Sequence, residues 1–384
     1  MLYGKKNNSP DKTGLLLSGG GARAAYQVGV LKAISELCPK QKENPFHLIS
    51  GTSAGSINAV ALAAHEGSFK ETISRINDVW SNFELHHVFR SDARCLLGRI
   101  LKWFSSRILP FGIGGSTPSS MLDNSPLREL LAKNIDFDAI DRQLASGNLG
   151  ALSLNTSSYS NGESITFFQS AHSVKEWRRA YRSGINQKIS LDMLMASSAI
   201  PVLFPPIKIN NQYYGDGSMR QTSPLSPLVH LQAKKIFIIG VRKHSSTSIT
   251  DDKKPSYPSM AKIAGYVMDT LFLNSLDSDI ERLSRINNLT EKIPAKHNKF
   301  TQIDHLIISP TEDLSEIAAD LFHTLPPSFR WGLKLLGMNK GSNRKFVSYL
   351  MFNKPFCQKL IELGYQDAMD RQAEIMNFLE IRCS

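Results

Sequence analysis

Cysteine is scarce in this sequence, and long apolar runs are absent. Four cysteines in 384 residues lie far apart and form no metal-like pair: Cys38, Cys95, Cys357 and Cys383. Their spacing argues against a disulfide framework and a zinc site, and it favours a reducing compartment. No window reaches the roughly 18 apolar residues that a membrane span needs. The polar start, MLYGKKNNSPDK, has no apolar run behind its charges, so no secretory signal is expected. These absences predict a cytoplasmic protein that meets a membrane, if at all, at its surface.

Negative charge is also in deficit, which leaves a net charge of +11. Such an excess attracts a protein to anionic surfaces, or it simply marks a soluble basic protein. The lysines and arginines are scattered, with no arginine-rich arm, zinc-finger spacing or RNA-recognition signature. A nucleic-acid partner is therefore not expected. Hydrophobic residues make up 41% of the chain, enough for a globular core. The sequence does not indicate an oligomeric state.

Strand–turn–helix patterns dominate the first part of the chain. TGLLLS (13–18) and PFHLIS (45–50) are short apolar runs, and each leads through a glycine-containing turn into a helical pattern. This order predicts an α/β domain with a parallel sheet. Further strands are expected at 151–157, 164–170, 235–241 and 305–310, and a helix at 191–199 that a proline at 201 ends.

Composition changes divide the remainder. Residues 1–11 are predicted to be a flexible leader, 12–310 the main α/β domain, and 311–384 a helical extension without strands. Two stretches look inserted. Residues 243–258 are polar and loop-like, whereas 84–125 are apolar, rich in aromatic residues from Trp103 to Phe111, and interrupted by glycine, proline and serine.

A single serine, Ser53, stands between Gly51 and Gly55 where the second strand meets a helix. The pattern G-x-S-x-G is typical of a nucleophile elbow, because flanking side chains would collide on a turn that raises the serine hydroxyl. The helix that follows also directs unpaired N–H groups toward developing negative charge. An ordinary tight turn is the competing interpretation.

Three successive glycines, Gly19, Gly20 and Gly21, follow the first strand and precede Arg23. Unshielded backbone N–H groups suit an oxyanion hole or a phosphate cradle. Gly19, Gly21 and Ala24 also fit the dinucleotide pattern G-x-G-x-x-A, although no acidic residue ends the second strand to hold a ribose. No Gly-Lys-Ser/Thr follows, which excludes a Walker A loop. A glycine turn for close helix packing remains open as well.

A serine nucleophile needs a group that accepts its proton. None of the ten histidines has a telling glycine or acidic context. Those near strands, the elbow helix or the apolar insertion are more typical of structural or exposed positions: His65, His86, His87, His230 and His305. Asp216, between two glycines in YYGDGSMRQTSP (213–224), is the other candidate base, although Gly-Asp-Gly alone is typical of a β-turn.

Taken together, these segments resemble the patatin-like phospholipase family. The resemblance rests on Gly19-Gly20-Gly21-x-Arg23, Gly51-x-Ser53-x-Gly55 and Asp216-Gly217, in that order along the chain. MASSAIPVLFPP (195–206) is also similar to the family's segment before its aspartate, and the likeness spans roughly residues 13–310. The sequence departs from the family pattern twice. Ser218 stands where a third glycine is frequent, and Ala24, favourable inside a helix, stands where a glycine often follows the arginine.

The resemblance implies a three-layer α/β/α catalytic domain over 12–310 with a mostly parallel sheet, plus the helical extension. It implies a dyad in which Ser53 attacks a lipid ester and Asp216 is the general base, with no histidine, metal or cofactor. The Gly19–Gly21 amides would form the oxyanion hole, supported by Arg23, Gly51, Gly55 and Gly217. Arg23 would either steady the glycine loop or meet a lipid phosphate.

The expected substrate is a phospholipid or acylglycerol, reached by peripheral contact with a membrane. The apolar residues around 103–111 or the C-terminal helices would lie at the lipid surface, unless both pack on the core. Alternatives remain in which the chain is an esterase for small soluble esters, a histidine-dependent hydrolase, or a non-catalytic lipid- or nucleotide-binding protein. The sequence does not indicate headgroup or chain-position preference.

Overall fold

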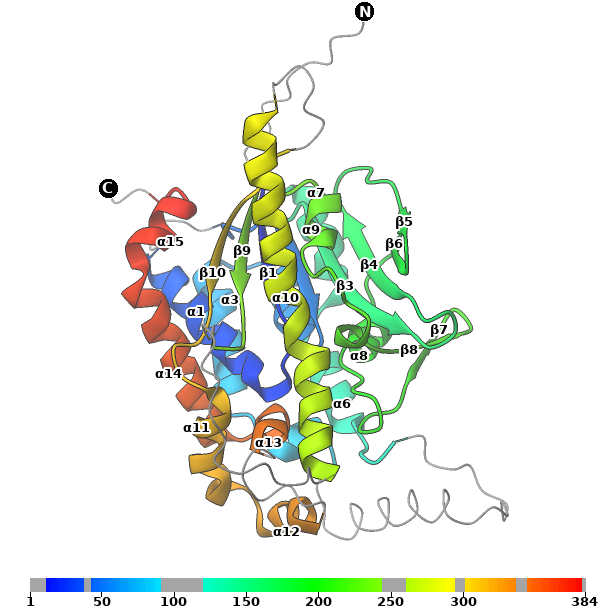
Figure 1. Ribbon diagram of the computed structural model, residues 1–384, viewed down its shortest axis with the longest axis vertical. Helices are drawn as coiled ribbons and strands as arrows, with labels where there is room; N and C mark the ends of the chain where they lie inside the picture. Colours follow the sequence, from blue (N-terminus) through cyan, green and yellow to red (C-terminus); the bar gives the residue numbers. More distant parts are fainter. Residues whose placement is uncertain are drawn as a thin grey trace, which may run out of the picture.

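The computed structural model describes residues 12–37, 43–90, 120–243, 260–293, 301–335 and 344–381 (Figure 1). The strands are β1 (Thr13–Leu17), β2 (Leu48–Thr52), β3 (Ala151–Ser158), β4 (Ser164–Ser170), β5 (Trp177–Arg179), β6 (Arg182–Asn186), β7 (Ile207–Ile209), β8 (Gln212–Asp216), β9 (Lys235–Ile239) and β10 (Asp304–Ile308). The helices up to β9 are η1 (Gly21–Ala24), α1 (Ala25–Leu37), α2 (Ala54–Ala63), α3 (Phe69–Ser81), α4 (Leu85–Val88), α6 (Ser125–Asn134), α7 (Phe137–Ser146), α8 (Leu191–Ser197), η2 (Gly217–Met219) and α9 (Ser226–His230). The later helices are α10 (Met260–Lys292), α11 (Leu314–Asp320), η3 (Leu321–Thr324), α12 (Pro327–Leu335), α13 (Arg344–Leu350), α14 (Lys354–Asp370) and α15 (Gln372–Phe378).

The described strands form one mixed sheet in the order β10-β9-β1-β2-β3-β4-β6-β5, with β8 pairing β3 and β7 pairing β8. The pairs β10–β9, β9–β1, β1–β2, β2–β3 and β4–β6 are parallel. The pairs β3–β4, β3–β8, β5–β6 and β7–β8 are antiparallel. The central parallel strands end at the same edge, which brings the turns after β1 and β2 together.

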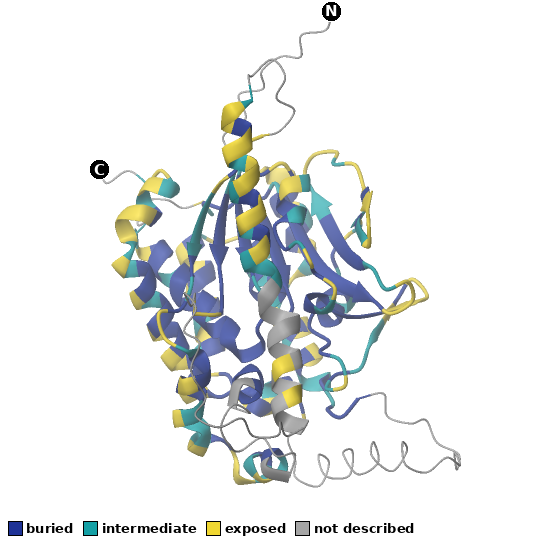
Figure 2. Cartoon of the chain, in the orientation of Figure 1, coloured by how far each residue is buried: buried dark blue, intermediate teal, exposed yellow. Residues whose placement is uncertain are grey.

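Helices cover both faces of this sheet. Leu15 and Leu17 of β1 belong to a core that includes α1, α2 and α14, whereas Leu16 belongs to a second core with α9 and α10. Alternate residues of a strand point to opposite faces, so a continuous apolar run is what a strand buried on both sides requires. Figure 2 shows β1, β2 and β3 buried along their whole length between the helical layers. The three-layer α/β/α architecture with a mostly parallel central sheet is therefore confirmed.

Every described element after β10 is helical, and α14 packs tightly along α1. A Cβ on Gly29 of α1 would lie 2.0 Å from the Ile361 carbonyl oxygen, and one on Gly364 of α14 would lie 2.2 Å from that of Tyr26. Glycine on each helix thus permits backbone-to-backbone approach. Phe356 and Leu360 of α14 are fully buried in the same core as β1 and α2. The C-terminal helices share this core with the rest of the chain.

The predicted strands at 13–18, 151–157, 164–170, 235–241 and 305–310 are present within two residues of their expected bounds, and that at 45–50 begins three residues later, at Leu48. Strands β5 to β8 and the 33-residue α10 were not predicted. The leader 1–11, the apolar residues 103–111 and nearly all of 243–258 lie outside the described residues. None of the described helices, including α10, has both the length and the apolar character that a membrane-spanning helix needs.

Candidate active site

Ser53 occupies the junction between β2 and α2 in a backbone conformation that few residues adopt. Its φ is +55° and its ψ is −128°. Such a backbone conformation costs about 1–3 kcal/mol, and it persists where the surrounding contacts hold the residue in place, often at functional sites. A Cβ on Gly51 would lie 2.6 Å from the Gly55 carbonyl oxygen, and one on Gly55 would lie 2.3 Å from that of Leu17. Both glycines are therefore required for the turn to pack against its own helix and β1.

The Ser53 hydroxyl donates a hydrogen bond to Asp216 Oδ2 at 2.6 Å. Asp216 ends β8, 163 residues further along the chain, and is fully buried, while Ser53 is 1% exposed. The other carboxylate oxygen, Oδ1, accepts the backbone N–H of Ser218 at 2.9 Å. The backbone N–H of Asp216 donates to the Ala199 carbonyl, which lies in the segment that resembles the family motif. The fold thus brings together the two residues that the sequence motifs single out.

Burial raises the pKa of Asp216 from its ordinary value of 3.8 to about 6. Hydrogen bonds from the Ser53 hydroxyl and from the backbone and side chain of Ser218 act in the opposite direction, because they stabilise the carboxylate. A carboxylate with this pKa is mostly ionised at neutral pH and accepts a proton more readily than an exposed aspartate. These properties suit a general base.

Two buried polar residues that the sequence interpretation did not single out hold the elbow in place. Ser197, the last residue of α8, accepts the Ser53 backbone N–H at 3.1 Å and donates to the Asn155 carbonyl at 2.7 Å. The Asn155 side chain on β3 donates to the Gly51 carbonyl at 3.1 Å. An asparagine in the middle of the buried run ALSLNTS is the signal that could have indicated this role.

The glycine loop lies directly beside the elbow. A Cβ on Gly19 would lie 3.1 Å from Ser53 Cβ and 2.6 Å from Ser218 Oγ. Within the described part of the chain, no hydrogen bond uses the backbone N–H of Gly19, Gly20 or Gly21 as its donor. The loop therefore places N–H groups near the serine without an internal acceptor to occupy them.

The Arg23 guanidinium points into the protein. The residue is 3% exposed and donates hydrogen bonds to Ser348 and Ser315 of the C-terminal helices. Of its two predicted roles, steadying the loop agrees with this position, and contact with a lipid phosphate does not. Gly217 is similarly enclosed, because a Cβ there would lie 2.2 Å from the Asn155 carbonyl oxygen.

The described histidines with hydrogen bonds use them elsewhere. His65 Nδ1 contacts the Thr72 hydroxyl at 2.8 Å, and His87 Nδ1 accepts the Glu84 backbone N–H at 3.1 Å. His323 Nδ1 contacts the Asp320 carbonyl at 2.8 Å. The Ser53 hydroxyl donates to a carboxylate instead, which favours the aspartate as base over a histidine.

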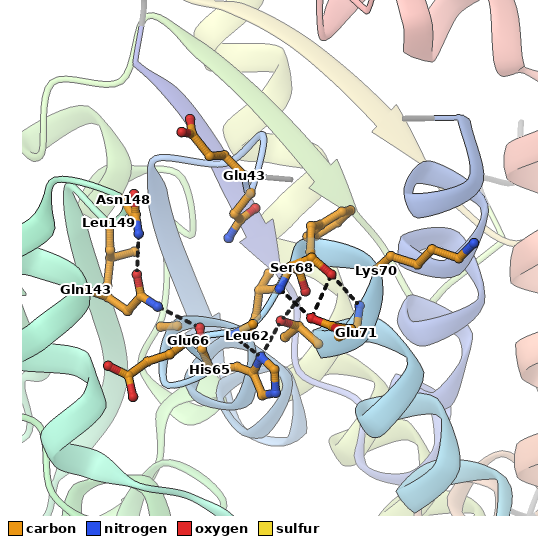
Figure 3. A pocket seen from close by; sticks show the side chains of 15 residues that line it. Glu43, Leu62, His65, Glu66, Ser68, Lys70, Glu71, Gln143, Asn148 and Leu149 are labelled. Atoms are coloured by element: carbon orange, nitrogen blue, oxygen red, sulfur yellow. Dashed lines mark hydrogen bonds between the residues drawn. The ribbon is translucent and has the colours of Figure 1, made fainter. Parts of the chain in front are cut away.

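A cavity of about 630 Å³ is lined by residues that include Glu43 and Asn44, which precede β2, whereas Ser53 follows that strand. Figure 3 shows its lining side chains. Its lining comes from the segments before β2 and β3 and from the connection between α2 and α3. Three of the polar side chains there support local structure: Ser68 and Glu71 form the N-terminal capping box of α3, and Gln143 donates to the His65 carbonyl. None of the predicted catalytic, oxyanion-hole or motif residues lines this cavity. Its volume alone does not make it the reactive site.

Similarity to known proteins points to one family. A model of the patatin-like phospholipase family matches residues 15–229. A Pseudomonas aeruginosa (strain BWHPSA011 / Pa011) protein described as a cGAMP-activated phospholipase is 26% identical over 211 residues, which are 55% of this chain and 53% of that protein. The chain thus spans about half the length of this curated relative.

Two solved structures are similar at a lower level. VipD from Legionella pneumophila is 14% identical with a TM-score of 0.34, over 97% of this chain and 67% of that chain. ExoU of Pseudomonas aeruginosa, in complex with SpcU, is 13% identical with a TM-score of 0.28, over 96% of this chain and 79% of that chain. The family match covers more than half of the 384 residues and includes the glycine loop, the elbow and Asp216, so the chain belongs to the patatin-like phospholipase family.

Proposed function

We propose that this chain is a metal-independent serine acyl hydrolase that cleaves fatty-acyl esters of phospholipids or acylglycerols, as a phospholipase A or lysophospholipase does. The observation that carries the proposal is the 2.6 Å hydrogen bond from the Ser53 hydroxyl to buried Asp216, on a positive-φ elbow beside unpaired glycine N–H groups. The family supports lipid esters as the substrate class.

In the acylation step, Ser53 Oγ attacks the ester carbonyl carbon as its proton passes to Asp216 Oδ2. The carbonyl π electrons move to oxygen, and the resulting oxyanion is stabilised by backbone N–H groups of Gly19–Gly21. Such donors contribute a few kcal/mol each, because they are already oriented before the charge develops. Collapse of the intermediate breaks the ester C–O bond, and Asp216 returns the proton to the departing alcohol. An acyl-Ser53 ester remains.

In the deacylation step, a water molecule attacks the acyl-enzyme carbonyl and gives a proton to Asp216. The same N–H groups hold the second oxyanion. Its collapse releases the fatty acid, and the proton returns from Asp216 to Ser53 Oγ. One carboxylate thus serves as base and acid in both halves of the reaction, so the scheme requires neither a histidine nor a metal.

The test is fatty-acid release from mixed phospholipid vesicles in the presence of a chelator, together with labelling by a fluorophosphonate probe. Wild-type protein should release fatty acid and carry the probe on the peptide that contains Ser53. Ser53→Ala should abolish both signals. Ser68→Ala, a serine that also contacts a carboxylate but in a helix cap, is the matched control and should keep both.

The same measurements separate the alternatives. Hydrolysis of short soluble esters with no release from vesicles would favour an esterase of another substrate class. Absence of labelling in folded wild-type protein would support a non-catalytic binding protein. If a single histidine substitution abolished turnover while the fold was retained, the aspartate would not be the sole base.

A further inference from the structure

The glycine loop contacts a helix that lies far beyond the family-matched residues. Gly21 has φ +55°, and a Cβ there would lie 2.2 Å from the carbonyl oxygen of Tyr349, near the end of α13. The backbone of α13 is therefore pressed directly against the turn that follows β1. Only glycine at position 21 combines this conformation with this close approach.

Arg23 connects the same turn to two C-terminal helices. Its Nε donates to Ser348 Oγ on α13 at 2.8 Å, and its Nη2 donates to Ser315 Oγ on α11 at 3.1 Å. The guanidinium carbon lies 4.1 Å from the centre of the Tyr349 ring, in a cation–π arrangement. Ser348 is fully buried and Tyr349 is 2% exposed. In Figure 1, α11 and α13 lie beside each other below the sheet.

Because Arg23 is buried, its guanidinium depends on these contacts. A guanidinium withdrawn from water is stable only where oriented partners replace its hydration, so its position is tightly determined by the groups around it. The Arg23 backbone N–H also donates to the Gly20 carbonyl at 3.1 Å, which closes the turn that carries Gly20 and Gly21. Anchoring the Arg23 side chain therefore fixes the direction of the glycine N–H groups.

We propose that α13, through Ser348 and the Tyr349 ring, positions Arg23 and thereby aims the Gly19–Gly21 N–H groups at the reacting carbonyl. This inference rests on the proposed function. It makes the C-terminal helices a working part of the active site and Ser348 a positioning residue, although the family match ends at residue 229. Loss of the Ser348 hydroxyl leaves the nucleophile and base unchanged and lets the loop relax.

The experiment compares Ser348→Ala, Ser348→Thr and Ser315→Ala with wild type in kcat and KM for a soluble short-chain ester, in the rate of fluorophosphonate labelling, and in Tm. Ser348→Ala should lower kcat and the labelling rate about tenfold, with KM nearly unchanged, because small misplacements of catalytic groups are costly. Ser348→Thr keeps the hydroxyl and should recover most of the loss. Ser315→Ala should have a smaller effect in the same direction, since its hydrogen bond is longer.

Tyr26→Phe is the control for general destabilisation. It removes the buried hydrogen bond from the Tyr26 hydroxyl to Asp367 Oδ2, 2.9 Å long, which joins α1 to α14 without reaching Arg23. Tyr26→Phe should lower Tm and keep kcat. If Ser348→Ala and Ser315→Ala keep wild-type kcat and labelling, or if Ser348→Thr fails to recover them, the positioning role is overturned while the dyad stands. Wild-type protein without Ser53-dependent hydrolysis would instead overturn the proposed function itself.

Discussion

The two ends of β2 present opposite kinds of polar environment. At its carboxyl end, Ser53 and Asp216 are at most 1% exposed and their side chains converge on each other. At the other end, the 630 Å³ cavity of Figure 3 includes polar side chains, Ser68 and Glu71, that complete the N-terminus of α3. The strand between them has five residues, so the two regions lie about 16 Å apart along it. Buried polar side chains that contact each other indicate a reactive site better than the volume of a cavity does.

The largest effect is expected from neutralising Asp216, the proposed base. Asp216→Asn keeps the shape of the side chain and removes its ability to take the Ser53 proton. We expect kcat to fall by about 10²–10⁴-fold, the range typical of a general base. Fatty-acid release and fluorophosphonate labelling measure this loss. A variant with normal turnover would show that another group accepts the proton.

How far the sequence predicted this site depends on the range of each interaction. Gly51, Ser53 and Gly55 are recognisable because a strand, a turn and a helix are local features. Ser197 and Asn155, which hold the elbow, and Ser348, which meets Arg23, come from segments 144, 104 and 325 residues away from their partners. A serine or asparagine in such a segment carries no periodic signal that identifies its partner. The fold had to be known first.

The same limit applies to the secondary structure. The central strands were predictable because burial on both faces makes them continuous apolar runs. Strands β5 and β7 have three residues each, too few for an alternating pattern. The helical C-terminal region was evident from its apolar spacing. Its contact with the glycine loop was not, because a helix pattern shows that one face is buried without showing against what.

A smaller effect concerns the pH dependence of the buried end. Asp216 must be ionised to accept a proton, and its pKa is raised to about 6, so kcat/KM should fall as the pH drops through about 6 and level off above it. The Ser218 side chain stabilises the carboxylate and lowers this pKa. Ser218→Ala should therefore move the acid limb to higher pH. Ser218→Thr, which retains a hydroxyl, is the control.

The measurement is kcat/KM for a soluble ester from about two pH units below to about two pH units above the expected pKa of about 6, where one unit is about 1.4 kcal/mol. The fold should first be shown intact across this interval by circular dichroism. An acid limb that stays in place in Ser218→Ala would mean that the Ser218 hydroxyl does not act on the base. A shift to lower pH would contradict the direction derived from the hydrogen bond.

The smallest expected effect lies at the opposite end of β2. The Ser68 hydroxyl accepts the Glu71 backbone N–H at 3.3 Å and donates to its carboxylate at 2.9 Å, as the N-cap of α3. Ser68→Ala removes this cap and should lower stability by about 1 kcal/mol, which is about 1 °C in Tm for a chain of this length. Because its role ends at the helix terminus, kcat should stay at the wild-type value, and Ser68→Thr should restore Tm. A large loss of activity in Ser68→Ala with an unchanged Tm would give this end of the strand a part in the reaction and remove the contrast between the two.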